Sequence, residues 1–256
     1  MKVARKARWW HQGKWMHALP FPPTLPTFSG NLFPALFLMA GLTVVAVGCP
    51  RGSQARFPLL TSDDPQAEAA LADARKAEEE GRADEAVGLY QRFLIQYPKD
   101  PLVAMAHLHL GRIAVERGEN AVAREHLAPV IQHPDRAVAE RALFFDGIAL
   151  HRGGESAKAL EQLTPLVGRT IAPEDTALLL ETIAQAALAV GDAFRAIRAL
   201  DALIGSGAPP HRKDQAQLLA AQLVSQEITP TQCDRLVDFL DRDGPIWPIA
   251  AKRALP

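Results

Sequence analysis

The sequence has very few cysteines. Only Cys49 and Cys233 occur among its 256 residues, so there is no disulfide framework and no pair of cysteines at metal-binding spacing. A disulfide between the two is the simplest structural interpretation. If Cys49 is modified instead, we expect Cys233 to be a partly buried small apolar residue.

Aromatic side chains and net charge are also scarce, at 6% of residues and −1 overall. The charge is uneven, because residues 1–48 carry five basic side chains and no acidic one. Without those five, the remaining 23 Lys and Arg face 29 Asp and Glu, a net charge near −6. An acidic body without a basic patch argues against a nucleic-acid partner.

The motifs of common enzyme classes are missing as well. The sequence contains no H-E-x-x-H, phosphate loop, G-x-S-x-G or dinucleotide fingerprint. His107 and His109 are two apart on an expected helix, so they point to different faces and cannot share a metal ion. His126 and His133 have no partner at ligand spacing, and Glu78–Glu80 reads as a solvated helix end. We therefore expect no enzyme, no cofactor and no metal site.

What the sequence does contain is a repeat. Four glycines are spaced 37, 36 and 37 residues apart, and each is followed five residues later by an alanine. Four residues after each alanine comes a large apolar or aromatic residue. The four sets are Gly81, Ala86, Tyr90; Gly118, Ala123, Leu127; Gly154, Ala159, Leu163; and Gly191, Ala196, Leu200. A period of this length is typical of stacked helical or mixed units.

The first unit reads as a helical hairpin. Residues 67–80 are rich in strong helix formers, and Asp64 and Pro65 suit the N-cap and first helical position. Gly81 is expected to end this helix with positive φ. The second helix then places Ala86, Tyr90 and Phe93 on one stripe, since residues three and four apart share a face.

The later units follow the same pattern. Asn120, Ser156 and Asp192 are expected to be the N-caps of second helices. Gly111 and Gly147 each lie seven residues before a turn glycine, inside the expected first helices. Because a glycine inside a helix costs about 1 kcal/mol relative to alanine, the two positions predict a close approach of neighbouring side chains.

The sequence thus predicts an all-α fold, an α-solenoid of four to five helical hairpins. The expected hairpins span 65–98, 101–133, 136–168 and 174–206. Residues 205–210 interrupt the pattern, and helices at 212–226, 229–240 and 245–255 are expected to form a degenerate terminal unit. Terminal units cover the exposed core of a solenoid, and Trp247 suits that role better than a binding role.

This pattern resembles the tetratricopeptide repeat. The family's small residue, turn glycine, alanine, aromatic residue and final proline correspond to Gly111, Gly118, Ala123, Leu127 and Pro134. The first unit has Gly81, Ala86, Tyr90 and Pro98 at the last four of these stations. No tryptophan opens a repeat, leucine replaces the aromatic residue in three of four units, and the units exceed the family's 34 residues.

The resemblance implies a protein-binding solenoid with a concave groove lined by the first helix of each repeat. Matching the family's inward-facing stations gives His107, Ala114, Phe144 and Thr182 as groove residues, with Arg75 and Arg112 as ligands for a partner's carboxylates. A structural role is the alternative for His107.

The N-terminus reads as a targeting segment. A basic start leads into an apolar run from Leu32 to Val47, followed by small residues and Cys49. This resembles a bacterial lipoprotein signal in which Cys49 carries the lipid (palmitate among its acyl chains), although the usual leucine three residues earlier is Ala46. An uncleaved anchor is the alternative, but the run of about 16 residues is shorter than the ~20 that span a bilayer. The true translation start is expected further downstream, with Met16 as one candidate.

These signals divide the chain into a signal peptide (1–48), the lipidated cysteine and a tether (49–63), four repeats (64–206) and the terminal unit (207–256). Pro50 rather than aspartate follows the cysteine, which by analogy favours the periplasmic face of the outer membrane over the inner membrane. The helical ending also suggests that a further domain once followed.

Residues 90–98 are similar to units in lipoproteins of the outer-membrane protein assembly machinery and in periplasmic cell-division coordinators. The repeats also resemble the helical half of lipoproteins that activate penicillin-binding proteins. We expect a non-catalytic, lipid-anchored scaffold that binds penicillin-binding proteins or β-barrel assembly components. The rival interpretations are an accessory subunit with a small-ligand site and a structural spacer at the membrane.

Overall fold

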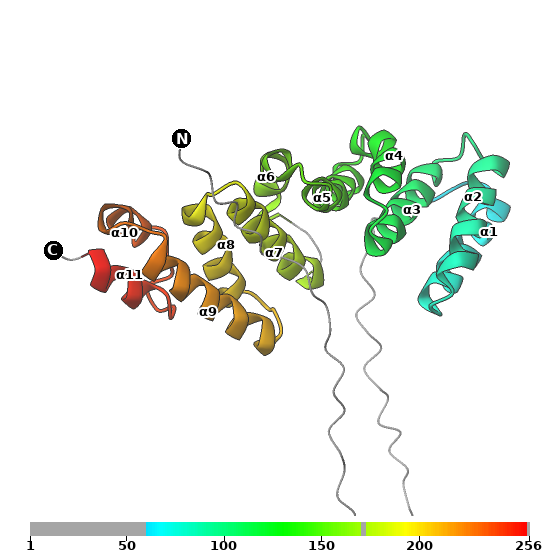
Figure 1. The fold of residues 1–256 in the computed structure, drawn as a ribbon. Coiled ribbons are helices and arrows are strands. Elements are labelled where there is room, and N and C mark those ends of the chain that lie inside the picture. Colours follow the sequence, from blue (N-terminus) through cyan, green and yellow to red (C-terminus); the bar gives the residue numbers. More distant parts are fainter. Residues whose placement is uncertain (1–59, 170–172, 255–256) are drawn as a thin grey trace, which may run out of the picture. The chain divides into compact units, whose positions relative to one another are not determined.

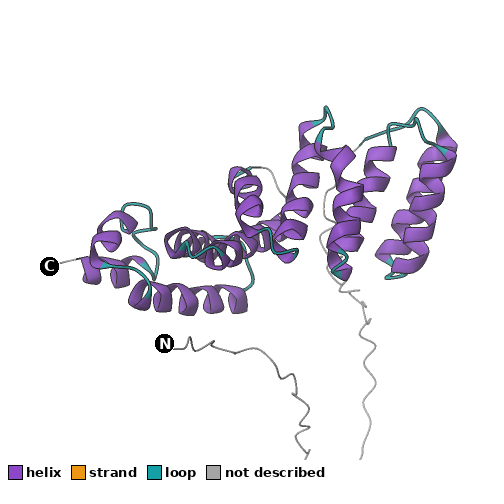
Figure 2. Ribbon diagram, turned by 45° about the horizontal axis from the view of Figure 1, so that its top comes forward, coloured by secondary structure: helices purple, strands orange, loops and turns teal. Residues whose placement is uncertain are grey.

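The computed structural model describes residues 60–169 and 173–254, and all regular structure within these ranges is helical (Figure 2). The predicted signal, Cys49 and most of the predicted tether lie outside the described residues. The helices are α1 (Pro65–Glu79), α2 (Ala83–Gln96), α3 (Val103–Arg117), α4 (Asn120–Ile131), α5 (Arg136–Arg152), α6 (Ser156–Leu163) with the 3-10 turn η1 (Thr164–Leu166), α7 (Pro173–Ala189), α8 (Ala193–Gly205), α9 (Pro210–Gln226), α10 (Pro230–Leu236) and α11 (Trp247–Ala254).

The helices pack in the order of the chain. From α1 to α9 each helix packs on the next, α10 packs on α11, and α11 returns to α9 (Figure 1). In addition α3 contacts α5 and α5 contacts α7, so the first helices of the second, third and fourth hairpins are stacked on one another. The predicted all-α fold of sequential hairpins, consistent with a helical repeat, is confirmed.

The four turn glycines behave as their spacing predicts. Gly81, Gly118, Gly154 and Gly191 have φ of 75°, 76°, 87° and 78°, in the left-handed region that residues with a Cβ avoid. The residue after each glycine donates its backbone N–H to a carbonyl in the last turn of the preceding helix, for example Glu119 N to Ala114 O at 2.9 Å. This closes the turn and leaves one residue between the glycine and the next helix.

That tight turn corrects two of the predicted N-caps. Asp64 and Asp192 cap α1 and α8 as expected, with their carboxylates accepting from the backbone N–H of Gln66 and Arg195. Asn120 and Ser156, however, are already the first residues of α4 and α6, behind N-caps Glu119 and Glu155 that make no side-chain capping bond. The helix starts one residue earlier than predicted because the N-cap directly follows the left-handed glycine.

The glycines inside helices also have the predicted role. A Cβ built on Gly111 would lie 2.5 Å from the Leu127 side chain, and one built on Gly147 would lie 2.4 Å from Leu163. Both distances are far inside van der Waals contact. In the second and third hairpins the repeated large residue of the second helix therefore lies directly against the backbone of the first helix.

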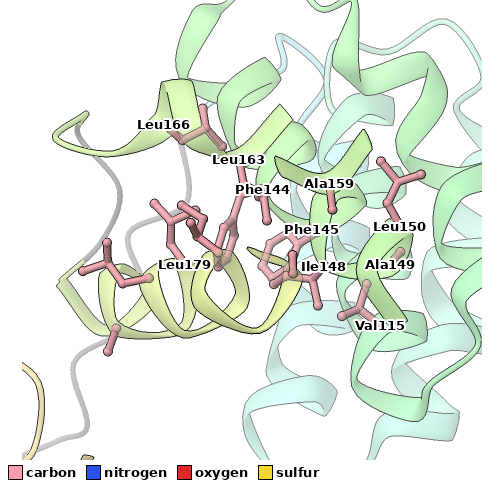
Figure 3. Packing of buried hydrophobic residues seen from close by; sticks show 14 of the residues in the cluster. Val115, Phe144, Phe145, Ile148, Ala149, Leu150, Ala159, Leu163, Leu166 and Leu179 are labelled. Carbon is pink, nitrogen blue, oxygen red and sulfur yellow. The ribbon is translucent and has the colours of Figure 1, made fainter. Parts of the chain in front are cut away.

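The repeat signature forms the core. All four signature alanines and the large residues that follow them are buried. Figure 3 shows Phe144 and Phe145 of α5 among buried side chains of α6, η1 and α7, including Leu163, Leu166 and Leu179. The alanine permits close approach of the paired helices, and the large residue fills the space beside it.

Both ends of the described chain contact this core. At the start, Leu60 packs on it, and the Ser62 hydroxyl and backbone N–H bond Asp100 and Glu68. The last four residues of the predicted tether are thus part of the first hairpin.

At the other end α9 begins at Pro210, two residues before its predicted start, and α10 ends at Leu236. Cys233 is fully buried, and Trp247 packs against the core. None of the described helices has the length and apolarity required to cross a membrane.

Candidate protein-binding site

The six groove residues inferred from the family resemblance fall into two groups, three that are buried and three that are partly exposed. Ala114, Phe144 and Thr182 are buried, and the Thr182 hydroxyl donates to the Leu178 carbonyl of its own helix at 2.7 Å. These three side chains pack inside the chain rather than at its surface. Arg75, His107 and Arg112 are partly exposed. Whether any of the six contacts a partner stays a prediction.

Arg112 already has carboxylate partners in its own chain. It pairs with Glu78 of α1 and with Glu116 one turn further along α3. Glu78 also accepts a hydrogen bond from the Tyr90 hydroxyl at 2.7 Å and lies 2.8 Å from His109 Nδ1. The side chain of Glu78 is only 10% exposed, so the prediction of a solvated helix end is wrong for this residue.

We call this group the Glu78 cluster; it consists of Glu78, Tyr90, His109 and Arg112. Its surroundings favour an ionised Glu78 and a neutral Tyr90. Burial alone would raise the pKa of Glu78, but the hydrogen bond from His109 and the positive charge of Arg112 outweigh it and lower that pKa. Burial lowers the pKa of His109 and raises that of Tyr90. An ionised Glu78 thus accepts from a neutral tyrosine stacked on His109, with ring centroids 5.0 Å apart. The cluster joins α1, α2 and α3.

A second pair that the sequence did not reveal joins α3 and α4. The Nδ1 atoms of His107 and His126 lie 3.2 Å apart, a contact between residues 19 positions apart in the chain. One imidazole donates to the other, so at least the accepting ring must be neutral. Burial lowers the pKa of both, and for His107 the nearby His126 adds to this effect. Among the described residues no three His, Cys, Asp or Glu side chains gather in a metal-binding group.

A charged cleft of about 580 Å³ lies between α4, α5 and α6. Its buried carboxylate, Asp146, accepts from Arg124 at 3.3 Å and from Gln162 at 2.9 Å. On the same wall Glu140 pairs with Arg136 and Arg169. The main charges of this cleft therefore neutralise one another.

A larger cleft, of about 660 Å³, lies between α6, η1, α7 and α8 and is closed on one side by Phe239; we name it the Phe239 cleft. Buried apolar side chains form its floor: Leu160, Leu180, Ile183 and Ala199. Phe239 is 55% exposed and Val167 is 45% exposed, so both present apolar surface to solvent at the cleft. The guanidinium groups of Arg195 and Arg198 lie at its edge.

Phe239 is held in place from two directions. Its ring meets Phe194 edge-on with centroids 5.9 Å apart, and the Arg198 guanidinium carbon lies 4.5 Å from its centroid. The loop that follows is tied to α8, because the Asp241 N–H donates to the Asp201 carboxylate at 3.0 Å. An exposed aromatic side chain is thus presented in a fixed position.

The sequence reasoning missed this cleft. The groove residues expected from the sequence all lie in first helices, whereas the cleft combines the first helix α7 with α6, η1, α8 and the loop after α10. Phe239 had one usable signal, a large aromatic residue among the acidic and apolar residues that follow α10. Arg198 had none, since nothing in the sequence relates it to a residue 41 positions later.

Comparisons with known proteins give no family for the chain. A scan against protein-family models found no match, and a search of curated proteins found none either. The described residues by themselves establish an all-helical domain of eleven helices packed as sequential hairpins.

Proposed function

We propose that this chain is a non-catalytic scaffold that binds another protein, and that its hairpins are tetratricopeptide-like units. The observation that carries the proposal is the Phe239 cleft, where a fixed, exposed aromatic ring borders an apolar floor. Aromatic residues and arginine are enriched in the centres of protein interfaces. A rigid ring of this kind contributes contact area at little cost in conformational entropy.

We also propose that the scaffold is lipid-anchored through Cys49 in a bacterial envelope, at the periplasmic face of the outer membrane. The support is the basic, apolar and small-residue pattern that precedes the cysteine. In this setting the partner is a penicillin-binding protein or another regulator of peptidoglycan synthesis, or a component of β-barrel assembly.

Crosslinking in cells tests the proposal. A photoreactive amino acid replaces Phe239 in the full-length chain, and the matched control carries it at Ile95, an apolar residue of α2 that is 79% exposed and distant in sequence. We expect wall synthases or β-barrel assembly proteins to be crosslinked from position 239 and not from position 95. Equal recovery from both positions, or enrichment of neither class, would contradict the proposal.

The anchor has a separate test. Replacing Cys49 with alanine is expected to prevent labelling by radioactive palmitate and to release the protein from the membrane fraction. Unchanged labelling and fractionation would exclude lipidation at this residue without affecting the crosslinking result.

One observation favours the alternative of an accessory subunit with a small-ligand site. The charged cleft between α4, α5 and α6 has a volume within the range of small-molecule sites. A ligand there would have to displace the Asp146–Arg124 or Glu140–Arg169 ion pairs. The protein-binding function therefore ranks first.

A further inference from the structure

We propose that the Phe239 cleft binds a short peptide segment in which an acidic residue lies next to a large apolar residue. This inference rests on the proposed scaffold function and adds the chemistry of the partner. Two parts of the cleft support the inference: its apolar floor and the arginine residues at its edge.

The apolar half has room for a large side chain. Along α8 the small residues Ala199 and Ala202 line the cleft, so this face of the helix is not filled by its own side chains. Across from them lie Leu180 and Ile183 of α7, with Phe239 at the side. An aromatic or branched apolar side chain of a partner would cover surface that is otherwise exposed, at about 25 cal/mol per Å² of apolar area buried.

The charged half favours a carboxylate. Arg195 and Arg198 are three residues apart on α8 and so share a face. Among the described residues Arg198 forms no ion pair, and its guanidinium lies over the Phe239 ring. This cation–π contact leaves guanidinium N–H groups available for two parallel bonds to a carboxylate.

Arg195 adds a second positive charge, and its present ion pair can be exchanged for one with a partner. Among the described side chains Arg195 pairs only with Asp192, the N-cap of its own helix, at 3.3 Å, and both side chains are substantially exposed. Exposed pairs of this kind contribute little to stability, so exchanging Asp192 for a partner's carboxylate costs little.

Two carboxylates of the cleft restrict where the partner's charge can lie. Glu161 of α6 is exposed on the opposite wall. Asp201 is buried, and burial raises its pKa even though it accepts the Asp241 N–H. The partner's carboxylate is therefore expected at the Arg198 edge and not along α6.

The probe is a random peptide library displayed on phage, selected on the full-length protein in detergent. Binders to the Phe239→Ser variant are removed first. We expect enriched sequences to contain Asp or Glu beside Phe, Leu, Ile or Trp. Phe239 is more than half exposed, so this substitution leaves the core intact.

A selected peptide is then compared with its amide counterpart, in which every Asp and Glu is Asn or Gln. We expect Arg198→Gln to weaken binding of the acidic peptide about tenfold, equivalent to ~1.4 kcal/mol, without changing binding of the amide peptide. The matched control is Arg92→Gln, at an exposed arginine of α2. Raising the salt concentration should weaken only the acidic peptide.

Three results would overturn the inference: selected peptides without acidic residues, an equal loss from Arg92→Gln, or no peptides specific to the intact cleft. Charge-free peptides that still require Phe239 would refute the acidic chemistry and leave the scaffold function standing. A failure of the scaffold function would appear separately, as equal crosslinking from positions 239 and 95.

Discussion

At the scale of single residues, Glu78 connects three helices through one carboxylate. Tyr90 and His109 bond it, and Arg112 pairs with it, from α2 and α3. Nothing in the run Glu78–Glu80 distinguishes the first glutamate from the other two. Which of three successive helical residues faces a neighbour depends on the packing of α3, which no local pattern specifies.

Replacing Glu78 with glutamine should therefore destabilise the protein. The amide keeps the size of the side chain but removes the charge that Arg112 and the buried hydrogen-bond donors require. We expect the free energy of unfolding to fall by about 1–3 kcal/mol, measured by urea denaturation of the full-length protein. Glu79→Gln, at the exposed neighbouring position, is the control and should change it by less than about 0.5 kcal/mol. Equal effects would refute the role of the cluster.

The histidine pair His107–His126 predicts that the stability of the protein depends on pH. Burial lowers the pKa of His107 and of His126 in the folded protein, so the unfolded chain binds protons more readily. Their contribution to stability is complete above the ordinary histidine pKa of 6.5 and is lost as the pH falls below it.

Denaturation at a series of pH values measures this loss. In the His126→Gln variant the fall in stability below pH 6.5 should be shallower, because the second imidazole is gone. His133→Gln, at a histidine for which no such pair exists among the described residues, should retain the full fall. A slope unchanged by His126→Gln would show that the pair does not control it.

At the scale of helices, glycine is present inside α3 and α5 because close packing leaves no room for a side chain, although alanine has the higher helix propensity. Alanine is a better helix former than glycine by about 1 kcal/mol, but at Gly147 its methyl group would meet Leu163. We expect Gly147→Ala to destabilise the protein by about 1–3 kcal/mol through overpacking.

The chain supplies a matched control in Gly88. It lies inside α2, and no atom is within 4 Å of a Cβ built on it. Gly88→Ala should therefore stabilise the protein by about 0.5–1 kcal/mol, which is the effect of helix propensity alone. Thermal unfolding of the two variants reads out the difference. The same sign of change in both would refute the close packing of Gly147 on Leu163.

The elements that repeat could be predicted from the sequence, whereas the elements that do not repeat could not. The turn glycines and the buried alanines follow from local backbone needs that recur at a fixed period, so one clear unit explained the others. The N-caps at Asn120 and Ser156 were misplaced by one residue because good capping side chains there outweighed the unseen turn geometry. The Phe239 cleft was missed because it joins a repeat to the irregular terminal unit, where the period has already ended.

At the scale of the whole described chain, contacts are confined to neighbouring hairpins. Stability should therefore be approximately a sum over hairpins and their interfaces, as in repeat proteins. In hydrogen exchange, Gly147→Ala is expected to reduce protection in α5, α6 and their neighbours while α1 and α2 keep theirs. Uniform loss of protection along the chain would instead indicate one cooperative unit.

This neighbour-only packing also has a mechanical consequence. If the chain is tethered before α1 and a partner holds it at the Phe239 cleft, any pulling force passes through every intervening hairpin interface in series. In the described chain the main helix contacts of α1 and α2 extend no further than α3, and those of α7 go to α5, α6 and α8. The weakest of these interfaces then sets the force at which the stacked hairpins begin to separate, and the Glu78 cluster lies at one of them, between the first and second hairpins.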